Sequence, residues 1–443
     1  MRSAADLSAT TLTRCHDVRI TRLGADGDGV AALPDGTPLY IPYALPGEEL
    51  SARVLLKRGE GFAAIAERRL ADSPDRAIPP CPHFGVCGGC SMQHLADPAY
   101  AAWKAALVGA ALCRAGFDTP DPPLLRTAPR TRRRMDLALR RRGAVVTVGL
   151  HAARSDNLVD LQVCEILDPA LFALVTDLRT TLRGLTCFRR EGSAIVNLLD
   201  SGPDLLLRLD AAPDAGDRSR LAALAERHAA PRIACAVGPR DAPEIVAMRY
   251  RAQTAFSGVL VSPPPGAFMQ ASRAGEAAIV AAVLAGLPAR LPARVPIVEL
   301  YAGCGTLTFA LAQRGRVLAF EGDAASAASL RDAAHNTGRA GRVEVATRDL
   351  VRQPLSVKDF ERTPAIVLDP PHTGAPVQMQ AIAASGVPCV IYVSCNPVAL
   401  ARDAQMLATA GYRLASVVTI DQFLWSARVE SVSVFTRDKP ARG

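Results

Sequence analysis

The segment VPIVELYAGCGTLTFALAQRG, residues 295–315, holds the clearest structural signal in this 443-residue chain. An apolar run leads into two glycines, Gly303 and Gly305, and a helical pattern of apolar residues follows them. Glycines at this place allow the backbone to turn tightly between a strand and a helix. The segment therefore predicts the first strand, loop and helix of a doubly wound α/β sheet.

The same alternation of strand and helix continues to the end of the chain. Near-continuous Val, Ile and Leu are typical of strands in a mostly parallel sheet that is buried on both faces. We expect such a domain over residues 263–443, with its ligands at the carboxyl ends of the strands. The strand patterns are RVLAFEGD from 316, RVEVATRD from 342, PAIVLDPP from 364, PCVIYVSC from 388, YRLASVVTI from 412 and ESVSVFTRD from 430.

An acidic residue after the second strand indicates a nucleoside-containing cofactor. Glu321 stands about 20 residues after the first loop, where a carboxylate can accept hydrogen bonds from ribose hydroxyls. The loop reads Gly-Cys-Gly-Thr, residues 303–306, and lacks the third glycine of dinucleotide-binding loops. S-adenosylmethionine (SAM) has no pyrophosphate, so the pattern favours SAM over NAD and predicts a class I SAM-dependent methyltransferase domain. An ordinary strand-to-helix turn would explain the glycines but explains the acid less well.

Two further strand ends carry residues suited to methyl transfer. Asp369-Pro-Pro ends the fourth strand, and the two prolines fix the backbone so that the carboxylate faces the reaction site. Cys395 ends the fifth strand and precedes a helix, whose N-terminus is expected to lower the pKa of the thiol. Cys389 lies within the same strand and is interpreted as a packing residue.

These residue types suit methylation of a pyrimidine at carbon 5. That carbon is too weak a nucleophile to attack SAM, but a thiolate that adds to carbon 6 produces an enolate whose carbon 5 can attack. A base must then remove the proton from carbon 5 so that the thiol can leave. Glu430, at the start of the last strand, is the candidate base.

The first 262 residues have a different organisation. Residues 11–72 read as short strands between Gly and Pro turns, which predicts a small OB-like antiparallel β-barrel. Residues 73–262 mix strands and helices and are expected to form an α+β central domain. Three cysteines stand within residues 81–90, and Cys164 follows far along the chain. On spacing alone, these thiols suit zinc and an iron–sulfur cluster equally.

The charge is carried almost entirely by arginine. The chain has 51 Lys+Arg against 43 Asp+Glu, a formal net charge of +8, and its lysines are at positions 57, 104, 358 and 439 only. Guanidinium groups suit phosphate contacts and base stacking, although a GC-rich genome produces the same bias. A run of arginines is either a solvated face, which is the commoner case, or a phosphate track on a nucleic-acid ligand. Its members are Arg130, Arg132, Arg133, Arg134, Arg140, Arg141 and Arg142.

No membrane or secretory segment is expected. No apolar run reaches the roughly 18 residues of a membrane span. The first 13 residues lack the charged-then-apolar order of a signal peptide, and the odd total of 11 cysteines argues against a disulfide framework. A soluble, cytoplasmic protein in a reducing compartment is the expectation.

Taken together, the motifs resemble the RNA 5-methyluridine (uracil-C5) methyltransferase family. The resemblance is carried by VELYAGCGTLTFALA, FEGD, LDPPHTG, YVSCNPVALARD and DQFLWSARVES. The N-terminal segment, with Gly24, Gly27, Gly29, Gly36 and ALPGE, resembles that family's RNA-binding TRAM domain. CPHFGVCGGCSMQH resembles its iron–sulfur motif. The resemblance implies transfer of the SAM methyl group to carbon 5 of a specific uridine, with ribosomal RNA favoured over transfer RNA.

The resemblance also implies residue roles. Cys395 would be the nucleophile and Glu430 the base. The SAM-site residues would be Gln270, Tyr301, Glu321 and Asp369. The ligands of a 4Fe-4S cluster would be Cys81, Cys87, Cys90 and Cys164, with zinc as the alternative metal.

Three positions depart from the family pattern. His372 stands where the family usually has Arg, Ser272 where it has Asn, and Arg428 where it has His. Arg428 lies two residues from Glu430 on the same strand face and is expected to lower the pKa of that carboxyl.

Other functions fit the residues less well. RNA 5-methylcytidine enzymes carry their nucleophile in a Pro-Cys after the Asp-Pro motif, whereas His372 stands here. Adenine amino-group methylases favour Asn-Pro-Pro with an aromatic, which is absent from this chain. A non-catalytic RNA-binding or assembly protein would not need Cys395, Glu430 and the glycine loop together.

Overall fold

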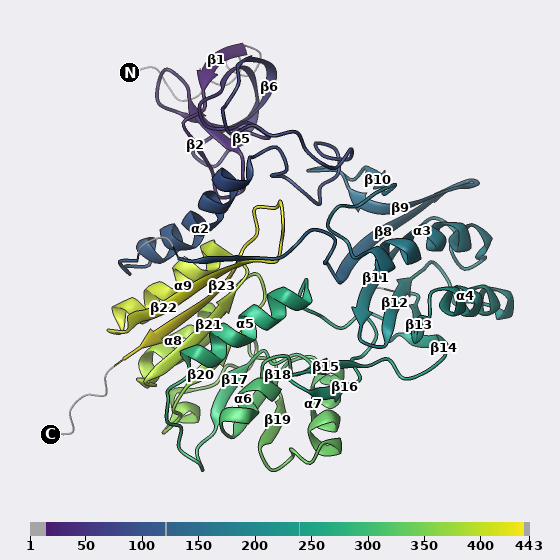
Figure 1. Cartoon of the computed structure of the whole chain (residues 1–443), viewed down its shortest axis with the longest axis vertical. Coiled ribbons are helices and arrows are strands. Elements are labelled where there is room, and N and C mark those ends of the chain that lie inside the picture. Colours follow the sequence, from purple (N-terminus) through teal and green to yellow (C-terminus); the bar gives the residue numbers. More distant parts are fainter. Residues whose placement is uncertain (1–14, 120–121, 239, 438–443) are drawn as a thin grey trace.

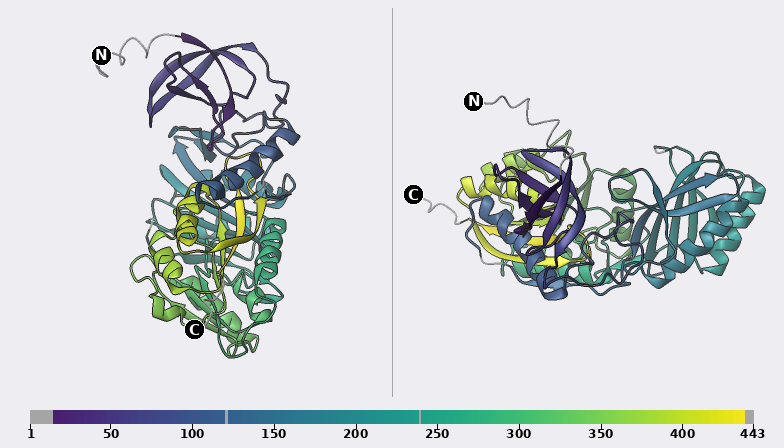
Figure 2. Two further views of the ribbon diagram at one scale, coloured as in Figure 1. Left: turned by 90° about the vertical axis from the view of Figure 1, so that its left-hand side faces the viewer. Right: turned by 90° about the horizontal axis from the view of Figure 1, so that it is seen from above.

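The computed structural model describes residues 15–119, 122–238 and 240–437 (Figure 1). Parts of the expected first and last domains, residues 11–14 and 438–443, lie outside the described residues. A small curved sheet lies at one end of the molecule, and two larger sheets lie side by side beyond it (Figures 1 and 2). None of the described helices has the length and apolar character needed to cross a membrane.

The N-terminal sheet has six strands in the order β1-β5-β6-β4-β3-β2. Its pairs are antiparallel except for β4 with β6. The sheet curls around a core that includes Ile20, Leu39, Ile41 and Val54, as a small barrel does (Figure 2). The strands are β1 (Cys15–Arg19), β2 (Arg22–Leu23), β3 (Gly29–Ala32), β4 (Pro38–Ile41), β5 (Glu49–Arg58) and β6 (Gly61–Ala71).

The central sheet has seven strands in the order β10-β9-β8-β11-β12-β13-β14, with two helices packed on it. All pairs are antiparallel except β12 with β13. Asp168 and Asp214 cap the two helices through their side chains. The elements are β8 (Arg134–Arg142), β9 (Val145–His151), β10 (Leu158–Asp160), α3 (Pro169–Gly184), β11 (Glu191–Leu199), β12 (Gly202–Arg208), α4 (Ala215–Arg227), β13 (Arg232–Ala236) and β14 (Glu244–Met248).

The C-terminal sheet has eight strands in the order β19-β18-β17-β20-β21-β23-β22-β7, and it is parallel except around β23. The strand order reverses on either side of β17, so the loop after β17 lies at the topological switch point. A hairpin of β15 (Thr254–Phe256) and β16 (Val259–Val261) and helix α5 (Arg273–Gly286) precede it. The other elements are β17 (Ile297–Leu300), α6 (Thr308–Arg314), β18 (Val317–Glu321), α7 (Ala324–Asn336), β19 (Val343–Thr347), the 3₁₀ turn η1 (Val357–Phe360), β20 (Ile366–Leu368), α8 (Pro376–Ser385), β21 (Cys389–Ser394), α9 (Pro397–Thr409), β22 (Arg413–Asp421) and β23 (Glu430–Thr436).

Both faces of this sheet are buried, as the apolar strand patterns predict. Successive residues of one strand, such as Ile297 and Val298, pack into the cores on opposite faces of the sheet. Helices α5, α6 and α7 cover the first core, and α8 and α9 cover the second. The predicted doubly wound, mostly parallel architecture is confirmed.

One segment of residues 73–262 joins the C-terminal sheet. Helix α2 (Asp97–Arg114) packs on α9 and buries Val108 and Leu112 in the second core. Strand β7 (Leu124–Arg126) then pairs in parallel with the edge strand β22. The sequence pattern did not indicate this, because a three-residue strand with two exposed side chains has no detectable periodicity.

Candidate active site

The carboxyl edge of the C-terminal sheet brings the predicted site residues together. Tyr301, Glu321, Asp369 and Cys395 each follow or end one of four adjacent parallel strands. Glu430 reaches the same edge from the opposite direction, because β23 runs antiparallel to β21 and Ser431 pairs with Ser394. The next pair in that register sets Cys395 beside Glu430.

The loop after β17 is built around unusual backbone angles. Tyr301, Gly303 and Gly305 all have positive φ, of 64°, 57° and 102°. A Cβ at position 305 would lie 2.6 Å from Leu330 Cδ1, so only glycine fits there. A Cβ at position 303 would meet nothing within 4 Å, so this side of the loop is open for a ligand.

Glu321 anchors the loop. Its Oε2 accepts a hydrogen bond of 2.7 Å from the backbone N–H of Gly303, and its Oε1 accepts one of 2.7 Å from the N–H of Asp323. The Glu321 side chain stays partly exposed and keeps lone pairs free for a ligand. The loop and carboxylate therefore fit the nucleoside part of SAM.

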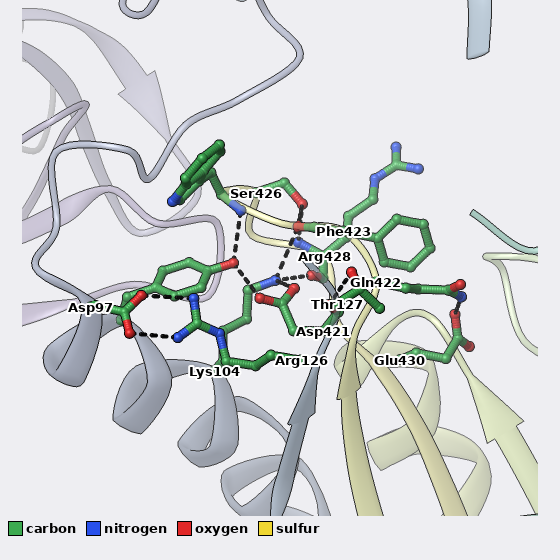
Figure 3. A network of polar contacts seen from close by, with 12 residues as sticks. Asp97, Lys104, Arg126, Thr127, Asp421, Gln422, Phe423, Ser426, Arg428 and Glu430 are labelled. Atoms are coloured by element: carbon green, nitrogen blue, oxygen red, sulfur yellow. Dashed lines mark hydrogen bonds and ion pairs between the residues drawn. The ribbon is translucent and has the colours of Figure 1, made fainter. Parts of the chain in front are cut away.

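A chain of four buried or partly buried side chains crosses the site. Gln270 Nε2 donates to Asp369 Oδ2 at 3.1 Å, and Gln422 Nε2 donates to both Gln270 Oε1 at 2.7 Å and Glu430 Oε2 at 2.9 Å. Figure 3 shows the Gln422–Glu430 end of this chain. The two carboxyl groups are thereby held in fixed positions by two amides.

Burial dominates the electrostatics of these acids. It raises the pKa of Asp369 and of Glu430 above the ordinary carboxyl range, and the charge of Asp369 raises that of Glu430 further. The predicted lowering of the Glu430 pKa by Arg428 is wrong, because Glu430 is buried while Arg428 is exposed. The Arg428 charge acts instead on Cys395, where it lowers the thiol pKa slightly against larger opposing effects.

The environment of the Cys395 thiol favours its protonated form. Burial, followed by the charges of Glu430 and Asp369, raises its pKa to about 12. The predicted lowering by the helix N-terminus is therefore wrong, since burial and two carboxylates outweigh the helix dipole. His372 Nδ1 lies 3.8 Å from Cys395 Sγ, so an imidazole is in contact with the thiol.

A cavity of about 670 Å³ opens over Cys395 and His372. Its wall also includes Asp26 from the N-terminal barrel, Arg134 from β8 and Phe423 from the β22–β23 loop. Residues from all three sheets therefore surround one space. Its volume is within the range of small-molecule and cofactor sites.

The arginine run does not form one surface. Arg132 and Arg134 line the cavity, whereas Arg140 pairs with Glu191. Arg133 is only 2 % exposed and holds the Gln270 carbonyl and the Glu276 carboxylate. The prediction of a phosphate track is wrong for Arg133, because its side chain is buried and already bound to Gln270 and Glu276.

The departure at position 272 has a structural explanation. Ser272 is the N-cap of α5, and its hydroxyl accepts a hydrogen bond of 3.0 Å from the Gly275 N–H. Serine and asparagine are both favoured N-caps, so either residue can begin this helix.

The four predicted cluster cysteines lie near one another. All are unpaired and partly exposed, and the pKa of Cys90 is raised to about 12 by burial and by the charges of the other three. Among the described residues, no three His, Cys, Asp or Glu side chains are close enough to hold a single metal ion. A zinc ion needs four sulfurs at about 2.3 Å, whereas a cluster is larger and takes thiols that stand further apart. Backbone N–H groups also point at the sulfurs of Cys87 and Cys164, and four thiolates are a donor set that both zinc and an iron–sulfur cluster accept.

Several residues of the site were missed in the sequence. Gln422 lies in the DQFLW motif, but nothing in the motif marks the glutamine as a partner of Glu430. Asp349 follows β19 beside Glu321. Burial raises the pKa of Tyr301 to about 12, with smaller contributions from the charges of Asp403 and Asp349. The strand-end pattern that identified Glu321 would have identified Asp349 as well. Glu299 is buried at the end of β17, which raises its pKa to about 8.

The sheet order and the loop at its switch point define a class I SAM-dependent methyltransferase. A family described as "tRNA (Uracil-5-)-methyltransferase" matches residues 292–438. An uncharacterized RNA methyltransferase of Rhizobium meliloti is 36% identical over 426 residues, which are 95% of this chain and 99% of that protein. The chain belongs to the RNA uracil-C5 methyltransferase family.

Two further relatives bear on this membership. The "23S rRNA (uracil(1939)-C(5))-methyltransferase RlmD" of Chromohalobacter salexigens is 34% identical over 435 residues, covering 95% of this chain and 89% of that protein. The structure of the Pyrococcus abyssi tRNA (uracil-54, C5)-methyltransferase in complex with S-adenosyl-L-homocysteine is similar with a TM-score of 0.70. It is 20% identical and covers 95% of this chain and 99% of its own. At that identity the similarity supports the fold.

Proposed function

We propose that this enzyme methylates carbon 5 of a specific uridine in ribosomal RNA through a covalent adduct between Cys395 and carbon 6 of the uracil. The observation that carries the proposal is the juxtaposition of Cys395, Glu430 and Asp369 at one sheet edge beneath a 670 Å³ cavity. A thiol and two carboxyls beside an open cavity are the groups that carbon 5 methylation of a pyrimidine requires.

The proposed reaction proceeds in four proton-balanced steps. The Cys395 thiol gives its proton to His372, and the thiolate adds to carbon 6. SAM supplies a methyl cation equivalent when bound, and carbon 5 of the resulting enolate takes it up. Glu430 removes the proton from carbon 5, the bond to Cys395 breaks, and His372 returns its proton to the departing thiolate. Glu430 then releases the carbon 5 proton to solvent, which restores the starting protonation state of the site.

The other site residues would bind SAM or hold the reacting carboxyls in position. Glu321, Tyr301 and the open side of Gly303 would hold SAM, and Asp369 would lie where the methyl group is transferred. The side-chain amide of Gln270 donates to Asp369 and accepts from Gln422, so its role is to position the Asp369 carboxylate. Burial favours the neutral form of these carboxyls, so Glu430 must be ionised before it can accept the carbon 5 proton.

The choice of RNA rests on one relative. The protein of C. salexigens is named for uridine 1939 of 23S rRNA and is similar over 95% of this chain, which supports ribosomal RNA. Transfer RNA is the alternative. Total ribosomal and transfer RNA from a strain lacking the gene should be incubated with the enzyme and labelled SAM. We expect label as 5-methyluridine at one site in ribosomal RNA; label in transfer RNA alone would contradict the proposal.

We infer that the N-terminal barrel acts as an RNA-binding TRAM domain, because its Asp26 and Ala25 line the same cavity as Cys395.

Arg134→Gln is expected to weaken RNA binding about tenfold and to reduce its salt slope by about 1, since Arg134 lines the cavity. Arg140→Gln is the matched control, because Arg140 belongs to the same run but pairs with Glu191 outside the cavity. Equal losses in both variants would contradict a localised RNA contact.

We propose that Cys81, Cys87, Cys90 and Cys164 hold a 4Fe-4S cluster with a structural role. Protein purified without oxygen is expected to contain about four irons per chain and to show the visible absorbance of such a cluster. Replacement of Cys90 by Ser should remove both, whereas replacement of the exposed Cys113 by Ser should change neither. Zinc in place of iron would contradict the assignment.

A further inference from the structure

A buried lysine joins helix α2 to the loop that precedes Glu430 (Figure 3). We call residues 421–429, which connect β22 to β23, the base loop. The side chain of Lys104 is 0 % exposed, whereas the other described lysines, Lys57 and Lys358, are exposed. In a chain that uses arginine for most of its positive charge, this lysine is unusual in both type and burial.

The Lys104 ammonium binds both ends of the base loop. Its Nζ donates to Asp421 Oδ1 at 2.9 Å, to the Phe423 carbonyl at 3.4 Å and to the Arg428 carbonyl. An ammonium is compact and has three donors that diverge, so it can serve three acceptors around one point. The planar fork of an arginine would not converge on these acceptors in the same way.

Tyr100 and Thr127, which come from the same part of the chain as Lys104, hold Asp421 and the tip of the base loop. Tyr100 donates to Asp421 Oδ2 at 2.7 Å and accepts from the Trp425 N–H at 2.8 Å. Thr127 donates to the Asp421 carbonyl through both its N–H and its hydroxyl, each at 3.1 Å. The buried carboxylate is thus fully partnered, and the base loop is held along its length.

The two ends of the base loop carry the residues that fix the position of the Glu430 carboxyl. Gln422, which follows Asp421, donates to Glu430 Oε2 at 2.9 Å. Glu430 stands two residues after Arg428, and Glu430 pairs with Ile420 across strands β22 and β23. A shift of either loop end would therefore move Glu430 relative to Cys395.

We propose that Lys104 is a positioning residue that sets the geometry of Glu430 for removal of the carbon 5 proton. The proposal rests on the function proposed above for Glu430. Lys104 does not line the cavity over Cys395, so it acts through the base loop. A displacement of about 1 Å at a reacting group can cost about 100-fold in rate.

The test measures a reaction intermediate. If the base is misplaced, methyl transfer proceeds but carbon 5 keeps its proton, and the methylated RNA stays bound to Cys395. Lys104→Met is expected to lower turnover 10- to 100-fold. It should also raise the fraction of enzyme in a denaturation-stable adduct carrying labelled methyl at least about tenfold. The probe is ribosomal RNA from a strain lacking the gene, and SAM binding should stay within about twofold of wild type.

Two more variants separate positioning from a general loss of structure. Lys104→Met combined with Asp421→Asn removes the ammonium without leaving a buried unpaired carboxylate, and it is expected to accumulate the adduct too. Arg126→Met is the matched control. Arg126 lies in the same network, and its backbone pairs with Asp421 in the β7–β22 ladder. Among the described residues its guanidinium donates to Asp97 and makes no hydrogen bond to the base loop, so no adduct is expected when only the side chain is changed.

The outcomes distinguish this proposal from the one on which it rests. If Glu430→Gln accumulates the adduct and neither Lys104 variant does, the positioning role is wrong and the base assignment stands. If no variant, including Glu430→Gln, accumulates it, the base assignment fails and the role of Lys104 with it. Accumulation in Arg126→Met equal to that in Lys104→Met would also overturn the positioning role.

Discussion

Replacement of Cys395 by alanine is expected to abolish methylation, with a loss of at least about 10⁴-fold in rate. Without the thiol, no group at the sheet edge can add to carbon 6, and carbon 5 stays too weak a nucleophile. The same change should abolish the covalent adduct with RNA that contains 5-fluorouridine, in which fluorine replaces the proton that the base must remove. Denaturing gel electrophoresis of enzyme with labelled RNA measures this adduct.

Cys389→Ala provides the matched control for that result. Cys389 begins β21, the strand that Cys395 follows, but it is buried among apolar side chains away from the cavity, where it donates to the Gly286 carbonyl. Its loss is expected to cost about 1 kcal/mol of stability and to leave adduct formation intact. An adduct that survives Cys395→Ala would show that the nucleophile is elsewhere.

Replacement of Glu430 by glutamine is expected to slow turnover about 10²- to 10⁴-fold. The methyl group still reaches carbon 5, but no base removes the carbon 5 proton, so a methylated adduct should accumulate on RNA with ordinary uridine. Glutamine has the size of glutamate and can keep the hydrogen bond from Gln422. The measurement is the yield of denaturation-stable adduct that carries label from methyl-labelled SAM.

The pH dependence of adduct breakdown tests the same assignment. Only the ionised carboxylate accepts a proton, and burial and Asp369 raise the pKa of Glu430. In the wild-type enzyme, breakdown should therefore accelerate as pH rises through a midpoint above the ordinary carboxyl range. In Glu430→Gln it should be slow and independent of pH. A wild-type midpoint within the ordinary range would contradict the buried environment of the base.

Much of the site was predictable because parallel strands end at one edge. Glu321, Asp369 and Cys395 each follow an apolar strand pattern, so their convergence follows from the sheet alone. The same reasoning would have found Asp349. It would not have found Lys104, whose partner Asp421 is 317 residues away in sequence, or Gln422, which links Glu430 to Gln270 through side-chain contacts that no local pattern marks.

The electrostatic predictions failed for a different reason. Arg428 is two residues from Glu430, and a helix follows Cys395, so sequence distance suggested lowered pKa values for both groups. Burial opposes both effects, and sequence distance does not measure burial. Arg133 illustrates the same limit, since the other arginines of its run are exposed or partly exposed but Arg133 is itself nearly inaccessible.

Local pattern alone determined the alternation of strands and helices, the glycine loop at its start and the residue types at the strand ends, because hydrophobic periodicity and turn chemistry act over a few residues. Tertiary structure alone decided which charges are buried, that β7 and α2 complete the C-terminal domain, and that Lys104 holds the base loop. Those features depend on contacts between distant segments, which packing brings together and which no local pattern encodes.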